Sequence, residues 1–342
     1  VSNNMPKWEI IGLPDNSIRE SKERVKAAIK NSGYELRSKK ILINLAPAEI
    51  KKEGSAFDLA IAIGILNNTG YIQNEKIEEY AILGELSLNG KINEISGILP
   101  MCIELKRLGI NKVILPKGNI KEASILKDLE IYGIENLKEA VEFLNGELKI
   151  EKNVVIEEKN QDTNTIDFNE VKGQENVKRA LEIAAAGGHN CLMIGSPGSG
   201  KTMLAQRIST ILPDMNFEES LEVTKIHSIA GMTKNNQIIT KRPFRSPHHT
   251  ASKISLVGGG KESKPGEISL AHRGILFLDE LPEFNKNTLE VLRVPLEDRK
   301  VLISRANKNH EYPANFMLIA SMNPCPCGYY GSNEKECTCS SN

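Results

Sequence analysis

One eight-residue stretch, Gly195-Ser196-Pro197-Gly198-Ser199-Gly200-Lys201-Thr202, constrains this chain more than any other. It has the pattern G-x-x-x-x-G-K-[ST] and lies between a short apolar run, Cys191–Ile194, and a helical pattern over 203–212. A strand, a glycine-rich loop and a helix in this order bind phosphate, because the glycines let backbone N–H groups turn towards an anion and the helix N-terminus adds its positive dipole. The stretch predicts a P-loop that binds a nucleoside triphosphate. A glycine-rich surface turn is the alternative.

The side chains of this loop have distinct expected roles. The ammonium group of Lys201 can reach the β- and γ-phosphates, and the hydroxyl of Thr202 can hold Mg²⁺. The other expected nucleotide-binding positions are Gly195, Ser196, Pro197, Gly198, Ser199, Gly200 and Met203. ATP and Mg²⁺ are therefore the predicted cofactors.

An apolar run over 274–278 ends in two carboxylates, Asp279 and Glu280. Behind a P-loop, this pattern is typical of an ATP-hydrolysing site, in which Asp279 orders the Mg²⁺ shell and Glu280 polarises the attacking water. A second apolar run, over 316–320, is followed by Asn323, which can hydrogen-bond the γ-phosphate or the water. The alternative is that Asn323 only initiates a turn before Pro324 and has no part in catalysis. The predicted catalytic residues are Glu280, Lys201 and Asn323.

Composition sets wide limits on the partners of the chain. Its 342 residues are enough for about two domains. The 44 lysines and arginines balance the 44 acidic residues, so any attraction to nucleic acid must be local. No apolar run approaches the ~18 residues of a membrane span, and no signal peptide is visible, so we expect no membrane partner. Six cysteines in a Lys- and Glu-rich chain do not resemble a disulfide scaffold, and a cytoplasmic location is expected.

Hydrophobic patterning predicts an α/β unit over 1–150, a polar linker over 151–165 and a nucleotide-binding domain over 166–342. The expected helices and strands lie in both domains. Helices are predicted over 15–30, 56–66, 99–108 and 175–186, strands over 41–45 and 112–115, and hairpins over 80–92 and 300–312. The Asn89-Gly90 pair suits the turn of the first hairpin.

Three stretches of the first unit, Glu53-Gly54-Ser55-Ala56, 83–90 and 109–116, resemble the Lon-protease-like domain of the ribosomal-S5-type α/β superfamily. A Lon-type peptidase needs a serine nucleophile that is activated by a lysine. By alignment, the serine falls on Ala56 and the lysine falls near Leu99, while Ser55 is one position off. We therefore expect a platform without peptidase activity.

Residues 242–250, 258–260 and 265–274, together with the P-loop and Asp279, resemble the magnesium-chelatase ATPase subunit, an AAA+ ATPase. With a Lon-like domain in front, the chain is similar to the ComM/YifB family of magnesium-chelatase-like proteins. The resemblance implies an α/β fold with a ribosomal-S5-type Lon-like domain followed by a P-loop AAA+ parallel-sheet domain. It also implies family sequence on both sides, so we expect the AAA+ domain to be truncated, with an arginine finger and a sensor-2 arginine outside this chain.

The same resemblance implies a ring-forming homo-hexamer, an ATP-driven motor that acts on single-stranded or branched DNA. ComM is described as a branch-migration helicase of natural transformation. A chelatase-type ATPase subunit that drives a metal-insertion partner, and a protein remodeller or ATP-dependent peptidase, are the rival interpretations.

The residues from 225 to 264 give separate support for a nucleic-acid partner. They include eight lysines and arginines and one glutamate, in a segment whose glycines and prolines predict loops. Phosphate binding by such a segment is salt-dependent. A basic loop that closes a subunit interface is the alternative. The candidate DNA-binding residues are Lys241, Arg242, Arg245, Lys253 and, at the tip of the second hairpin, Lys308.

Four of the six cysteines lie in one short segment, as two C-x-C pairs separated by nine residues: Cys325, Cys327, Cys337 and Cys339. Four thiolates in one loop suit tetrahedral Zn²⁺. The usual zinc knuckle has two residues between its cysteines, and the single residue here makes binding by both members of a pair harder. Free thiols or a redox pair therefore remain alternatives to zinc.

Overall fold

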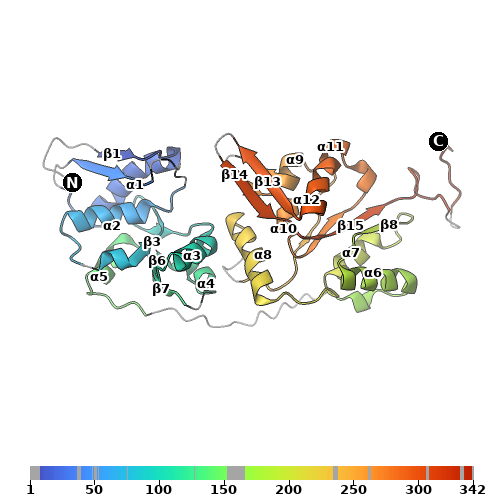
Figure 1. The fold of residues 1–342 in the computed structure, drawn as a ribbon, viewed down its shortest axis with the longest axis horizontal. Coiled ribbons are helices and arrows are strands. Elements are labelled where there is room, and N and C mark those ends of the chain that lie inside the picture. Colours follow the sequence, from blue (N-terminus) through green and yellow to red (C-terminus); the bar gives the residue numbers. More distant parts are fainter. Residues whose placement is uncertain are drawn as a thin grey trace. The chain divides into compact units, whose positions relative to one another are not determined.

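Two units make up the chain in the computed structural model, the first formed by residues up to Glu158 and the second by most of the residues from Lys159 (Figure 1). The structure describes residues 8–36, 40–47, 49, 52, 54–74, 76–126, 128–151, 166–233, 238–260, 263–305, 308–331 and 335–340, without the side chains of Arg305 and Lys308. Apart from Glu151, the predicted linker over 151–165 lies outside these residues. No helix in the described ranges is long and apolar enough to cross a membrane.

Three short sheets form the strands of the first unit. A parallel sheet has the order β3-β6-β7, β1 pairs with β2 in parallel, and β4 pairs with β5 in antiparallel fashion. The strands are β1 (Trp8–Ile11), β2 (Ile41–Asn44), β3 (Tyr80–Ile82), β4 (Glu85–Leu86), β5 (Ile92–Asn93), β6 (Lys112–Pro116) and β7 (Glu130–Ile134). The helices are α1 (Asn16–Asn31), α2 (Asp58–Asn68), α3 (Ile98–Arg107), α4 (Ile120–Ala123) and α5 (Leu137–Leu144), with 3₁₀ turns η1 (Ile77–Glu79) and η2 (Lys117–Asn119).

The helices of this unit follow from their caps and apolar faces. Helix α1 begins after Asp15, whose carboxylate accepts a hydrogen bond from the Ile18 amide at 2.8 Å. It buries Val25 and Ile29 against α2, which is apolar on most of its surface and lies in the middle of the core. The predicted helices over 15–30, 56–66 and 99–108 are therefore present, with ends shifted by one or two residues.

The predicted hairpin over 80–92 is wrong in its first half. Tyr80–Ile82 pairs in parallel with β6, and only β4 and β5 form the hairpin, around a loop over 87–91. The run is broken at Gly84, where a Cβ atom would lie 2.9 Å from the Cγ2 atom of Ile92. A glycine lets the chain pass this close to its neighbour, so it can leave one sheet and enter the next.

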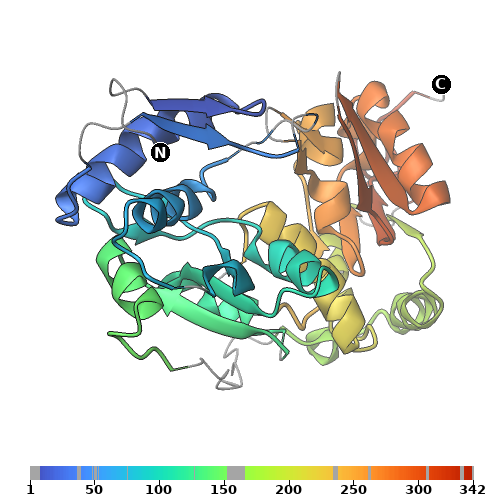
Figure 2. The same cartoon turned by 60° about the vertical axis from the view of Figure 1, so that its left-hand side comes forward.

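The second unit is built on a four-stranded parallel sheet with the order β8-β15-β12-β9. These strands are β8 (Cys191–Ile194), β9 (Phe244–Arg245), β12 (Ile275–Leu278) and β15 (Met317–Met322). Two antiparallel pairs accompany them: β10 (Gly258–Gly259) with β11 (Lys264–Pro265), and β13 (Lys300–Arg305) with β14 (Lys308–Pro313). Strand β13 lies beside α12 in both views of the fold (Figures 1 and 2).

The helices of the second unit surround this sheet. They are α6 (Glu175–Gly187), α7 (Lys201–Ile208), α8 (Phe217–Ile229), α9 (Lys253–Val257), α10 (Glu267–Leu270), α11 (Lys286–Leu289) and α12 (Arg293–Asp298), with 3₁₀ turns η3 (Phe168–Glu170), η5 (Leu281–Glu283) and η6 (Glu290–Leu292). Strand β12 is buried on both faces. Its Phe277 packs in one apolar cluster and its Leu276 and Leu278 pack in another, which is typical of an inner strand of a parallel sheet.

The sheet order gathers three loops at one edge. Strands β8 and β15 are the first and last of the sheet in sequence, yet they pair, and β12 pairs with the other side of β15. Because all are parallel, the residues that follow them meet at the carboxyl edge, where ligands bind in open α/β sheets. The expected strand over 316–320 runs on to Met322, so Ser321 belongs to the strand itself.

Candidate nucleotide-binding site

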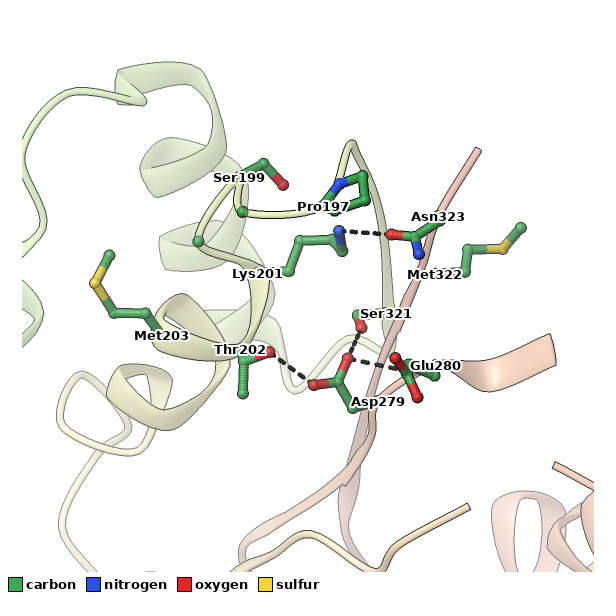
Figure 3. Close-up of a pocket in the computed structure, with 12 residues that line it drawn as sticks. Pro197, Ser199, Lys201, Thr202, Met203, Asp279, Glu280, Ser321, Met322 and Asn323 are labelled. Atoms are coloured by element: carbon green, nitrogen blue, oxygen red, sulfur yellow. Dashed lines mark hydrogen bonds between the residues drawn. The ribbon is translucent and has the colours of Figure 1, made fainter. Parts of the chain in front are cut away.

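A pocket of about 440 Å³ opens at the carboxyl ends of β8, β12 and β15 (Figure 3). Its volume is in the range of small-ligand sites. It is lined by Pro197, Gly198, Ser199, Gly200, Lys201, Thr202, Met203, Asp279, Glu280, Ser321, Met322 and Asn323. The predicted P-loop, both predicted carboxylates and the predicted asparagine therefore line one pocket. Gly195 and Ser196 do not line it, but their carbonyl groups contact Lys201.

The P-loop has a conformation that requires its glycines. Gly198 and Gly200 have φ angles of 79° and 84°, in the left-handed region that side chains with a Cβ atom disfavour. Helix α7 begins directly after Gly200, so its first amides face the loop. The Nε2 atom of Gln174 donates a hydrogen bond to the carbonyl of Ser199 at 2.8 Å and holds the loop from outside. The loop can therefore present backbone N–H groups to an anion.

Lys201 lies at the centre of the pocket. Its ammonium donates hydrogen bonds to the carbonyls of Gly195 at 2.7 Å and Ser196 at 3.0 Å, and to Oδ1 of Asn323 at 3.2 Å. Figure 3 shows the ends of Lys201 and Asn323 facing each other across the pocket, whereas Met203 and Met322 point away from the polar groups. The cation and the amide can thus contact the same phosphate oxygen.

Asp279 is the second centre of the site. The hydroxyl of Thr202 donates to its Oδ2 atom at 2.7 Å, and Oδ1 accepts hydrogen bonds from the Ser321 hydroxyl and, at 3.1 Å, from the Glu280 amide. Burial alone would raise the pKa of Asp279, but these hydrogen bonds and the charge of Lys201 lower it below its ordinary value. The carboxylate is therefore ionised beside a hydroxyl, the pair of oxygens that Mg²⁺ prefers.

Glu280 has an exposed side chain and an uncommon backbone conformation. Its φ angle is 53°, in the left-handed region, and it begins the short turn η5. Residues held in this region cluster at functional sites, where the surrounding structure fixes them. The conformation turns the chain sharply after β12, so that Glu280 lines the pocket beside Asp279.

Sequence reasoning gave no role to Ser321 and Gln174. Ser321 is fully buried and orients Asp279 from the neighbouring strand, while Gln174 fixes the P-loop from a turn before α6. A polar residue at the carboxyl end of a strand next to β12 was a usable signal for Ser321. For Gln174 the chain offers no local pattern of that kind.

Comparisons with known proteins agree with this geometry. A family model described as "Magnesium chelatase, subunit ChlI" matches residues 167–342, and one described as "Subunit ChlI of Mg-chelatase" matches residues 1–119. YifB of Escherichia coli (strain K12) is 44% identical over 338 residues, which cover 99% of this chain and 66% of YifB. The competence protein ComM of Haemophilus influenzae is 42% identical over 334 residues, 96% of this chain and 65% of ComM. The chain belongs to the ComM/YifB family of magnesium-chelatase-like proteins.

This ComM/YifB family member spans slightly less than two thirds of the length of YifB and ComM. Its similarity to the chelatase subunits themselves is narrower. The magnesium-chelatase 38 kDa subunit of Rhodobacter capsulatus is 26% identical over 174 residues, which cover 46% of this chain and 50% of that subunit.

The two arginines proposed as DNA contacts have partners inside the protein. Arg245 makes a bidentate ion pair with Glu267, with N–O distances of 2.6 and 2.7 Å. Arg242 donates to the carbonyl of Arg273 at 2.7 Å and to the carboxylate of Glu219 at 3.3 Å. These guanidinium groups tie α8 and α10 to β9 and to the residue stretch just before it.

The three lysine candidates differ in what the structure describes. Lys241 and Lys253 are exposed, and Lys253 is the first residue of α9. The side chain of Lys308, at the start of β14, lies outside the described part of the chain. The expectation that the basic segment consists of loops is wrong in part, since Lys225 belongs to α8, residues 244–245 form β9 and residues 253–257 form α9. These elements build the unit, so only part of the segment is a surface loop.

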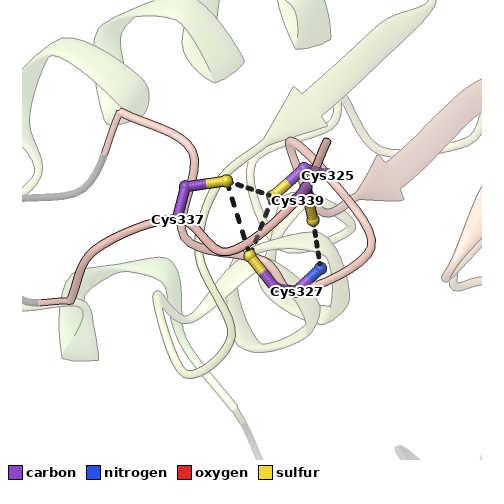
Figure 4. Close-up of side chains that lie close together, drawn as sticks. All are labelled: Cys325, Cys327, Cys337 and Cys339. Atoms are coloured by element: carbon purple, nitrogen blue, oxygen red, sulfur yellow. Dashed lines mark hydrogen bonds between the residues drawn. The ribbon is translucent and has the colours of Figure 1, made fainter. Parts of the chain in front are cut away.

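The four cysteines of the C-x-C pairs come together after β15 (Figure 4). Their sulfur atoms all lie within 4.8 Å of one another. Among the residues that the structure describes, no other group of three or more His, Cys, Asp or Glu side chains is placed to hold a metal ion. The single residue between the cysteines of each pair therefore does not keep the sulfurs apart.

Proposed function

We propose that this protein is an AAA+ ATPase of the chelatase type that hydrolyses MgATP in the pocket at the carboxyl edge of the second unit. One observation carries the proposal: the Thr202 hydroxyl and the Asp279 carboxylate, 77 residues apart in sequence, are joined at 2.7 Å at the mouth of a P-loop. A P-loop needs this pair to hold the Mg²⁺ of a nucleotide. The hydrogen bond from the Lys201 ammonium to Oδ1 of Asn323 supports the same assignment.

Each pocket residue has a role in this reaction. The P-loop amides and Lys201 bind the phosphates and balance their charge, while Thr202 and Asp279 hold Mg²⁺, which neutralises charge that develops in the transition state. Glu280 lies beside Asp279 and polarises the attacking water. Asn323 orients the water or the γ-phosphate from the tip of β15.

Substitutions separate binding from hydrolysis. We expect Lys201→Ala to abolish ATP binding, because the cation acts on ground-state phosphates. We expect Glu280→Gln to keep the ATP affinity and to lower turnover by roughly 10²–10⁴-fold, the range of general-base catalysis. Equilibrium binding of a fluorescent ATP analogue and phosphate release measure the two effects. Glu283→Gln is the control, because Glu283 is an exposed carboxylate of the same turn and does not line the pocket. Normal hydrolysis by Glu280→Gln would remove Glu280 from the reaction.

The substrate of the motor is proposed to be DNA. The support is the breadth of the similarity: a relative named as a competence protein matches 96% of the chain, whereas a chelatase subunit matches 46% of it at lower identity. The proposed activity is helicase or branch-migration work in natural transformation or recombination, by a cytoplasmic homo-hexamer. Exposed Lys241 and Lys253 are candidate phosphate contacts, and Arg242 and Arg245 remain candidates that also make ion pairs inside the unit, with Glu219 and Glu267.

The rival functions predict different stimulants of ATP turnover. Turnover by the whole protein should rise with branched or single-stranded DNA, and the gain should fall as salt increases, because phosphate contacts release counterions. Stimulation by unfolded protein alone would favour a protein remodeller. The positions of the expected peptidase dyad hold Ala56 and Leu99, so no proteolysis is expected. ATP turnover that rises with neither branched nor single-stranded DNA would favour a chelatase-type subunit that drives a metal-insertion partner.

A further inference from the structure

The cysteine loop lies directly against the nucleotide pocket. It begins directly after Asn323, whose amide contacts Lys201, and its first cysteine is Cys325. It then passes Pro197 of the P-loop so closely that a Cβ atom on Gly328 would lie 2.6 Å from Cδ and 2.7 Å from Cγ of that proline. The cysteine loop therefore contacts the P-loop through Pro197 and is continuous with Asn323 at the end of β15, on the opposite side of the pocket.

The sulfur positions fit a metal and not a disulfide. The Sγ atoms of Cys325, Cys327 and Cys337 are 3.4, 3.6 and 3.8 Å apart in pairs. A regular tetrahedron with Zn–S bonds of about 2.3 Å has edges of about 3.8 Å, whereas a disulfide bond is about 2.05 Å long. All four cysteines are free thiols in the structure. The spacing of these three sulfurs is that of ligands around one cation, and the sulfur of Cys339 lies within 4.8 Å of them.

Backbone amides point at these sulfurs, as they do at thiolate ligands. The amide of Tyr330 donates to Sγ of Cys325, and the amide of Cys327 donates to Sγ of Cys339, both at 3.3 Å. Hydrogen bonds of this kind stabilise the negative charge of a thiolate and orient it for a metal. The second one crosses from the first C-x-C pair to the second, so it brings the two halves of the loop together.

The loop has little else to fix its shape. None of its described residues, 324–331 and 335–340, lies in a helix or strand. The cysteines are half-buried, and Tyr330 has 70% of its surface exposed. A short irregular segment of this kind needs cross-links to hold one conformation, and metal–ligand bonds supply them.

We propose that the four cysteines bind one Zn²⁺, and that the zinc-bound loop supports the nucleotide pocket by holding Pro197 and Asn323 in place. The support role rests on the proposed function, whereas zinc binding does not. Four thiolates and no open position mark the site as structural, so the metal takes no part in hydrolysis. Loss of zinc frees the loop from Pro197 and lets the tip of β15 move relative to Lys201.

Metal content tests the first half of the proposal. The whole protein should hold one zinc per chain by elemental analysis, and Co²⁺ exchanged into it should give the absorption bands of a tetrahedral thiolate site. Cys327→Ser combined with Cys337→Ser should remove the metal. Cys191→Ser is the control, because Cys191 lies in β8 outside the loop, and it should keep the zinc. Metal-free protein whose four loop thiols titrate rapidly would overturn the site.

Nucleotide affinity tests the second half. Zinc is removed by a chelator, the chelator is then removed, and Mg²⁺ is supplied in excess. The binding of a fluorescent ATP analogue should weaken by about tenfold, the lower end of the cost of losing residues that support a site, and returning Zn²⁺ should restore it. Gly328→Ala should keep one zinc per chain and still weaken binding, because the added methyl group collides with Pro197. Gly331→Ala is the control variant in the same loop. The φ angle of Gly331 is also positive, but a Cβ atom at this position meets nothing within 4 Å.

The outcomes separate the two proposals. Zinc-loaded protein that binds no nucleotide would refute the proposed function and leave the metal site intact. Equal ATP affinity with and without zinc, and for Gly328→Ala and Gly331→Ala, would overturn the support role. Because the chelation experiment uses the unaltered chain, it remains decisive even where a cysteine variant fails to fold.

Discussion

The ion pair between Arg245 and Glu267 gives a direct test of whether that arginine serves the fold or DNA. Arg245 belongs to β9, the edge strand beside β12, and Glu267 is the first residue of α10. Their side chains are 24% and 21% exposed, and both N–O contacts are below 2.8 Å. The pair therefore joins the sheet edge to a helix at a site that is mostly shielded from water.

The expected magnitude follows from this partial burial. Exposed pairs contribute about 0–1 kcal/mol, and breaking a fully buried pair costs about 3–5 kcal/mol. A pair at one-fifth exposure lies between these limits, so Arg245→Ala should lower the free energy of unfolding by about 2 kcal/mol. In a domain of this size that corresponds to a fall in Tm of roughly 4–8 °C.

A double-mutant cycle isolates the pair. Arg245→Met, Glu267→Gln and the double variant are compared by thermal and denaturant unfolding, and the double variant should lose less stability than the two single losses together. Lys253→Met, at an exposed lysine of the same segment, is the control and should leave Tm unchanged. An unchanged Tm for Arg245→Met, combined with a large loss of DNA affinity, would refute the structural role and restore Arg245 as a DNA contact.

Two further predictions concern titrating groups of the second unit. Ser321→Ala should raise the pKa of Asp279, because one hydrogen bond to the carboxylate is lost, and an NMR titration that finds no rise would contradict this. Burial lowers the pKa of His272 below its ordinary value, although the hydrogen bond to Glu222 opposes this effect. The unfolded chain therefore binds this proton more readily, so stability should fall as the pH drops below about 6.5, and His272→Asn should reduce that loss in unfolding curves measured between pH 8 and 5.

The parts of the site that could be predicted from sequence are those with a local pattern. The P-loop glycines and Lys201 lie within eight residues, and Asp279 and Glu280 directly end an apolar run. Their meeting with Asn323 needed one further assumption, a parallel sheet whose strand ends share an edge.

The interactions that the sequence did not reveal have a common physical cause: in each case the partner is remote in sequence. The ion pair of Arg245 was not predicted, because its partner Glu267 lies 22 residues away. Gln174 reaches the P-loop across 25 residues. The hairpin error at Gly84 has the same origin, because the strand before it pairs with β6, about 30 residues further on. Charge and turn patterns do not encode such pairings.

The strand order of the second unit also has a consequence for how the protein is made. Strand β8 emerges from the ribosome first and β15 last, yet these two strands pair and carry Lys201 and Asn323 to the same pocket. At typical synthesis rates of about 5–20 residues per second, β15 is synthesised roughly ten seconds after the P-loop. Until then the apolar β12 and β8 have no strand between them, and the pocket lacks one wall. Nucleotide binding by a nascent chain would therefore report the moment at which the central strand is inserted and the sheet is complete.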